Sequence, residues 1–158
     1  MGKINLQKVI IGGLVAGVVL NVADFITYGV VLKDDMAAAM AAIGKPPVAD
    51  SMIPLFVGLD FVVGVFLVYL YAAIRPRFGP GPATAVKAGL MTWFIAGLIH
   101  ALFEAPMGLM PTNLMVISTA VMLVAAPLAA VVGAKFYTEG SGVGAGAGAG
   151  MAGMGSRM

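Results

Sequence analysis

The chain has 158 residues, of which 61% are hydrophobic and 10% are charged, and its mean hydropathy is +1.03. Soluble domains carry roughly a quarter of their residues as charges, so this composition predicts a protein that lies in lipid. The net charge of +2 is too small, and its basic residues too scattered, for a nucleic-acid interface. The sequence contains no cysteine, which excludes disulfides, thiolate metal sites and cysteine nucleophiles.

Four apolar segments are each long enough to cross the roughly 30 Å hydrocarbon core of a bilayer at about 1.5 Å per helical residue. We predict membrane spans at residues 4–32, 52–74, 83–109 and 112–137. Lys3 and Lys8 before the first apolar run would also suit a signal peptide, but Asn21 does not fit the small-residue cleavage pattern and the run continues to Leu32. The predicted fold is all-α: an integral membrane four-helix up-and-down bundle formed by residues 1–139.

A short helix is expected between the first two spans, at about residues 34–43. Asp34 is a suitable N-cap residue and Gly44 a suitable C-terminal stop. Met36, Met40 and Ile43 share one helix face, so this helix should lie on the membrane surface or on the bundle.

The second connection and the C-terminal tail have distinctive compositions. Residues 75–82 combine two arginines with proline and glycine, which predicts a tight hairpin between antiparallel helices. Residues 140–158 are almost entirely Gly, Ala and Met and predict a disordered tail, because such side chains cannot offset the entropy of ordering. The alternation of glycine with small residues at 142–150 also suits a silk-like strand, for which a single short repeat has nothing to stack on.

Lysine and arginine are unevenly divided between the two sides of the predicted bundle. The side that holds the N-terminus has seven: Lys3, Lys8, Arg75, Arg77, Lys87, Lys135 and Arg157. The opposite side has only Lys33 and Lys45. Because cytoplasmic loops carry the excess of basic residues, we expect both termini to lie in the cytoplasm.

Small residues are spaced for close contact between helices. Lipid gives apolar helices no hydrophobic reason to associate, so helix contacts depend on small residues and polar groups. Gly13 and Gly17 are four residues apart in the first span. The fourth span repeats this spacing at Ala125, Ala129 and Gly133. Such spacings also occur by chance in glycine-rich spans, so a span without partner contacts is the alternative.

Four ionisable residues fall inside the predicted spans: Asp24, Asp60, His100 and Glu104. Each costs about 2.5 to 3.5 kcal/mol to insert unless it finds a partner or water. Antiparallel threading brings Asp24, Asp60 and His100 to one level, roughly 12 to 14 Å below the outer boundary. Glu104 lies one turn nearer the surface on the face of His100. Three uncharged polar residues are expected at or beside this layer: Asn21, Ser118 and Thr119.

This polar layer is open to several interpretations. Carboxylates with an imidazole suit a proton relay or a cation site, and the same donors suit a hard or borderline divalent metal. In the structural alternative, His100 bonds Asp24 or Asp60 and the layer only holds the helices together. The sequence has no Glu-x-x-His metal signature, phosphate loop or nucleophile elbow, so neither a particular cofactor nor an enzymatic activity is predicted.

The chain resembles a group of small, uncharacterised bacterial inner-membrane proteins with four helices. The resemblance rests on three segments: Ile10–Gly17 followed by Asn21 and Asp24-Phe25, then Met36–Met40, and Leu70–Pro82. It covers nearly the whole chain except the tail. It implies a bacterial source, the inner membrane and four spans, and it implies no activity.

The thin four-helix unit, its short loops and its many small residues favour a non-enzymatic accessory or assembly subunit of a larger membrane complex. The expected partners are membrane lipids and either other membrane subunits or further copies of this chain, without nucleic acid. The alternative is a small transporter or channel-like protein that binds a proton or cation at the Asp24, Asp60 and His100 layer.

Overall fold

The computed structural model describes residues 3–140 of the chain. Within that range it is helical and contains no β-strand. Four helical stretches are long and apolar enough to cross a membrane: Leu6–Val31, Asp50–Phe78, Pro82–Met107 and Thr112–Ala134. The prediction of an all-α chain with four long apolar helices is therefore confirmed. The predicted tail lies outside the described residues except for Gly140.

Three of the four stretches combine several helical segments. The first joins α1 (Leu6–Asp24) to the π-helix η1 (Phe25–Val31), and the second joins the 3₁₀ turn η2 (Asp50–Met52) to α3 (Ile53–Phe78). The third runs through α4 (Pro82–Thr92), the π-helix η3 (Trp93–Ile99), α5 (His100–Glu104) and the 3₁₀ turn η4 (Ala105–Met107). The fourth is α6 (Thr112–Ala134), and the short helix α2 (Lys33–Ala42) follows η1.

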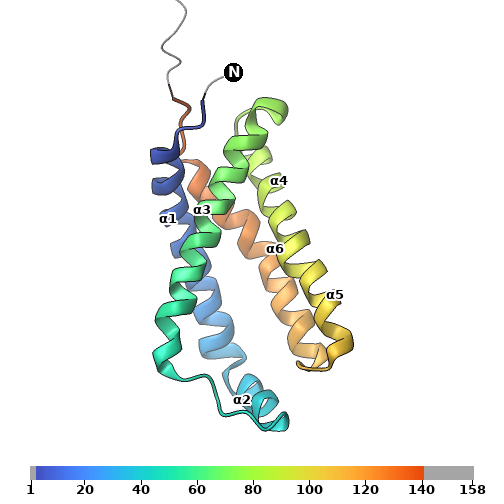
Figure 1. Ribbon diagram of the computed structural model, residues 1–158. Coiled ribbons are helices and arrows are strands. Elements are labelled where there is room, and N and C mark those ends of the chain that lie inside the picture. Colours follow the sequence, from blue (N-terminus) through green and yellow to red (C-terminus); the bar gives the residue numbers. More distant parts are fainter. Residues whose placement is uncertain (1–2, 141–158) are drawn as a thin grey trace, which may run out of the picture.

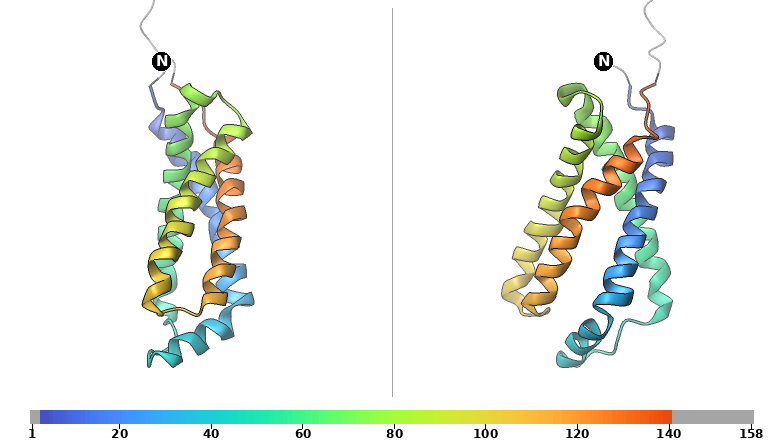
Figure 2. Two further views of the ribbon diagram at one scale, coloured as in Figure 1. Left: turned by 90° about the vertical axis from the view of Figure 1, so that its right-hand side faces the viewer. Right: turned by 180° about the vertical axis from the view of Figure 1, so that it is seen from behind.

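The long helices form two pairs, α1 with α3 and α4–α5 with α6 (Figure 1). The start of α1, the α3–α4 turn and the end of α6 lie together at what we call the closed end. α2 and the α5–α6 connection lie at the opposite, open end. The pairs approach each other near the closed end and diverge toward the open end, as the views from the side and from behind also show (Figure 2).

Glycines bring the helix backbones together in the closed half. A Cβ atom at Gly64 of α3 would overlap the backbone of Gly13 and Gly17 of α1. A Cβ atom at Gly133 of α6 would lie only 2.6 Å from the carbonyl oxygen of Gly12 of α1. The other two small residues singled out in α6 are buried: Ala125 and Ala129. These close approaches tie α1 to both α3 and α6.

The α3–α4 connection is shorter than the predicted hairpin at 75–82. α3 continues through Pro76 to Phe78, and only Gly79–Gly81 forms the turn. Interior proline disfavours a helix because it lacks a backbone donor, and α3 continues for only two residues beyond Pro76. Gly79, with φ +82°, ends the helix, and its carbonyl accepts a hydrogen bond of 2.7 Å from the Thr84 hydroxyl.

The short helix α2 matches its prediction more closely at its end than at its start. Leu32 occupies the N-cap position, and Asp34 lies in the first turn. There its carboxylate faces the positive end of the helix dipole. Gly44 adopts a left-handed φ of +70°, and the Lys45 N–H donates to the Met40 carbonyl at 2.9 Å. This is a Schellman motif, and α2 ends where Gly44 was predicted to end it.

Candidate functional site

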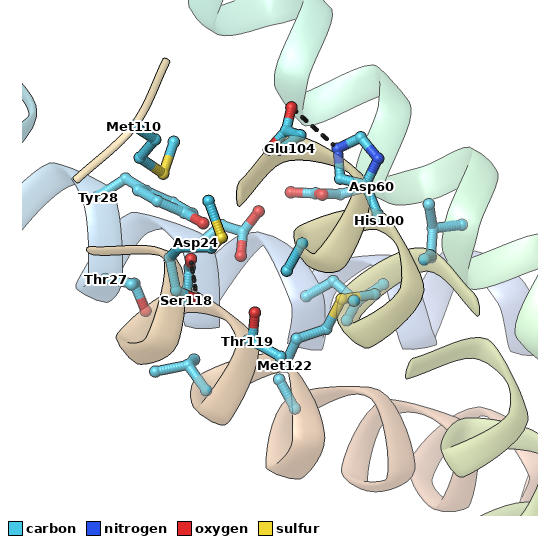
Figure 3. Close-up of a pocket in the computed structure, with 18 residues that line it drawn as sticks. Asp24, Thr27, Tyr28, Asp60, His100, Glu104, Met110, Ser118, Thr119 and Met122 are labelled. Atoms are coloured by element: carbon cyan, nitrogen blue, oxygen red, sulfur yellow. Dashed lines mark hydrogen bonds and ion pairs between the residues drawn. The ribbon is translucent and has the colours of Figure 1, made fainter. Parts of the chain in front are cut away.

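A pocket of about 360 Å³ lies between the two helix pairs in the open half of the bundle. Every long stretch contributes to its wall, and Figure 3 shows the polar side chains directed into it from different helices. The structure places six of the seven residues predicted for the polar layer on this wall: Asp24, Asp60, His100, Glu104, Ser118 and Thr119.

The imidazole of His100 pairs with a carboxylate of its own helix. His100 Nε2 lies 3.3 Å from Glu104 Oε1, and the two side chains are 65% and 36% exposed. The sequence-based structural alternative paired His100 with Asp24 or Asp60, and this pairing is wrong in the structure. Side chains four residues apart are neighbours on any helix, whereas α5 diverges from the α1–α3 pair toward the open end.

The other two carboxylates face the pocket without such a partner. Within residues 3–140, no hydrogen bond or ion pair joins the carboxylate of Asp24 or Asp60 to another side chain. Asp24 is exposed and Asp60 is half-buried. The pocket is therefore accessible, and two of its carboxylates are not used to hold helices together.

Asn21 lies beside the pocket and is not part of its wall. Its Nδ2 donates to the Gly17 carbonyl at 2.9 Å and to the Val57 carbonyl of α3 at 3.4 Å. Asn21 precedes Asp24 by three residues and so lies near the same face of α1. Its side chain is nevertheless close enough to α3 to donate a hydrogen bond to the α3 backbone. It ties α1 to α3 beside the pocket and is not one of the lining residues.

Ser118 and Thr119 of α6 make hydrogen bonds of different kinds. The Ser118 hydroxyl donates to the Leu114 carbonyl of its own helix at 2.8 Å. The Thr119 carbonyl accepts a hydrogen bond of 2.9 Å from the Trp93 indole, which links α6 to η3. The Ser118 hydroxyl also lies 3.1 Å from the Met115 carbonyl.

Sequence reasoning missed the two π-helical segments, which flank the pocket. Asp24 directly precedes η1, and His100 directly follows η3. In η1 the Leu32 N–H donates to the Thr27 carbonyl at 2.7 Å, the five-residue spacing of a π-helix. Each π segment shifts the face that the following helix presents, so it changes which side chains reach the pocket. Such segments are frequent at functional sites.

Further lining residues were not singled out from the sequence as pocket residues. Tyr28 lies next to Asp24 in Figure 3, and Met110 and Met122 are labelled on the same wall. Tyr28 follows Asp24 by four residues, a spacing that could have indicated it, whereas the methionines are indistinguishable in sequence from ordinary packing residues.

The donor set does not converge on a point. Within the described residues, no group of three or more His, Cys, Asp or Glu side chains is placed to hold a metal ion. The arrangement is a pocket with charges distributed around its wall. No protein-family model, curated protein or solved structure matches the chain.

Proposed function

We propose that this chain is a multi-pass protein of a bacterial inner membrane, with four antiparallel spans and both termini in the cytoplasm. The four apolar stretches have mean hydropathies between 1.6 and 2.4, and large apolar side chains cover their outer faces. The closed end would face the cytoplasm, because basic residues gather there. They lie at the start of α1, around the α3–α4 turn and just beyond the end of α6.

The orientation predicts the result of a fusion experiment. A reporter active only in the cytoplasm should be active at residue 3 and after residue 140, and inactive when inserted at Gly44. A reporter active only outside should give the reverse pattern. Activity of the first reporter at one terminus alone would contradict antiparallel threading of four spans.

We further propose that the protein is a small, non-enzymatic transporter or channel-like protein that binds a cation or proton in the pocket. The observation that supports this function is the pocket itself, lined by three carboxylates and one imidazole from three helices. Each such group costs about 2.5 to 3.5 kcal/mol to insert into a bilayer. A role confined to helix packing gives no reason for that cost, because Asp24 and Asp60 make no bond between helices in the described part of the chain.

Ion uptake into vesicles tests this function. Purified protein in phosphatidylcholine vesicles should raise uptake of protons, read with a pH-sensitive dye, or of radiolabelled Na⁺ above that of empty vesicles. The double variant Asp24→Asn, Asp60→Asn should lower this uptake by about tenfold or more, because a charged partner is lost at each position. Asp50→Asn is the matched control, since Asp50 is exposed and lies outside the pocket. Uptake equal to that of empty vesicles, or equal in all variants, would sink the proposal.

The accessory subunit predicted from the sequence is the second candidate. One observation favours it: only 17% of the most apolar part of the Asp50–Phe78 stretch is buried, although its mean hydropathy is 2.3. This surface suits either lipid or the helices of a partner. Purification in mild detergent should then recover a partner in fixed stoichiometry, and a stable monomer would contradict this candidate.

A further inference from the structure

We infer that the pocket takes a small organic cation, a protonated amine with an apolar body, in preference to a bare metal ion. This inference rests on the proposed function and names the class of ligand for the same site.

The size of the pocket is the first observation. A volume of about 360 Å³ falls in the range of sites for small organic molecules, roughly 300 to 1,000 Å³. A metal ion instead needs several donors converging at about 2.0 to 2.6 Å. Because the acidic and imidazole side chains of residues 3–140 form no such group, their charges suit a ligand that extends across the space between them.

The charge on the wall is the second observation. Three carboxylates face one imidazole, and that imidazole is paired with Glu104. Asp24 and Asp60 therefore form an acidic region that receives no cation from the described residues. An ammonium group of a ligand would donate charge-assisted hydrogen bonds to these carboxylates, which are roughly twice as strong as bonds between neutral groups.

The arrangement of polar and apolar residues along the pocket is the third observation. Leu20 precedes Asp24 by four residues, and Val63 follows Asp60 by three; all four residues line the pocket. Because α1 runs toward the open end and α3 runs away from it, both apolar side chains belong to the next turn toward the closed end. At 1.5 Å per residue this apolar turn lies about 4.5 to 6 Å deeper than the carboxylates.

On the other helix pair, apolar residues line the pocket on both sides of the polar level. In α6, Met122 follows Ser118 by four residues toward the closed end, and Met115 precedes it by three toward the open end. Met122 therefore adds to the apolar turn on the closed side of the polar groups. A ligand that fits would place its apolar body in the deep turn and its ammonium group between Asp24 and Asp60.

Calorimetric titration of the full chain in phosphatidylcholine nanodiscs tests this ligand class. The probes are butylammonium, ammonium, neutral butanol, Na⁺ and Mg²⁺, each also titrated into empty nanodiscs. Butylammonium should bind more tightly than every other probe. Asp60→Asn should weaken butylammonium binding by about tenfold or more. Val63→Thr, which keeps the side-chain shape, should weaken butylammonium severalfold and leave ammonium unchanged.

The controls separate this inference from the proposed function. Asp50→Asn should bind as the parent does, and Asp24→Asn serves as the second pocket variant if Asp60→Asn does not fold. If ammonium or a metal ion binds through Asp60 and butylammonium binds no more tightly, the organic-cation inference is wrong while the cation site stands. The inference is also wrong if butanol matches butylammonium. If no cation binds in a manner that depends on Asp24 or Asp60, both proposals fail.

Discussion

Gly64→Val should separate α1 from α3 and lower the stability of the bundle. A Cβ atom at position 64 would overlap backbone atoms of Gly13 and Gly17, and a backbone cannot move aside as the end of a flexible side chain can. Overpacking of a well-packed contact costs about 1 to 3 kcal/mol and sometimes more. We expect a loss near 3 kcal/mol, measured as the shift in the unfolding midpoint during titration with sodium dodecyl sulfate.

Gly58→Val is the matched control for this substitution. Gly58 lies in the same helix, and a Cβ atom there would have no heavy atom within 4 Å. Valine also forms helix slightly better than glycine does, so the control should be neutral or mildly stabilising. If both valine variants unfold at the parent midpoint, the close approach of α1 and α3 does not occur in the protein.

The elements of this fold that could be predicted from sequence are those determined within a single helix. The four long helices follow from the length and hydropathy of each apolar segment, and Gly44 ends α2 because a left-handed residue is needed there. The extent of the α3–α4 turn was overestimated, because proline at 76 is compatible with either a helix or a turn.

The pairing of polar side chains could not be predicted, because it depends on how the helices sit relative to one another. Residue spacing alone brought Asp24, Asp60 and His100 to a common depth, and the structure places all three on one pocket. Spacing does not reveal that the helix pairs diverge, so His100 pairs with Glu104 of its own helix. It also does not reveal the π segments η1 and η3, which arise without any distinctive residue pattern.

The closed end is held by a cluster that sequence reasoning did not anticipate. Tyr137, three residues beyond α6, is only 5% exposed and packs edge-to-face on Tyr71 of α3, with ring centroids 5.9 Å apart. The guanidinium of Arg75 lies 5.7 Å from the centre of the Tyr137 ring and pairs with Glu139 at 3.3 Å. The Tyr71 hydroxyl accepts a hydrogen bond of 3.1 Å from the Gly81 N–H of the α3–α4 turn. The cluster therefore joins the end of α6 to α3 and its turn.

Tyr137→Ala should consequently lower the stability of the bundle by about 3 kcal/mol or more, because truncation of a buried aromatic side chain removes its contacts and leaves a cavity. Tyr137→Phe should retain most of the stability, since the ring makes the contacts with Tyr71 and Arg75. Tyr69→Ala is the control, because that side chain is 45% exposed on the same helix as Tyr71. The three midpoints would be compared in the same detergent titration. Equal losses for Tyr137→Ala and Tyr69→Ala would mean that residues 135–139 do not pack on α3, and the closed end would then depend on its glycine contacts alone.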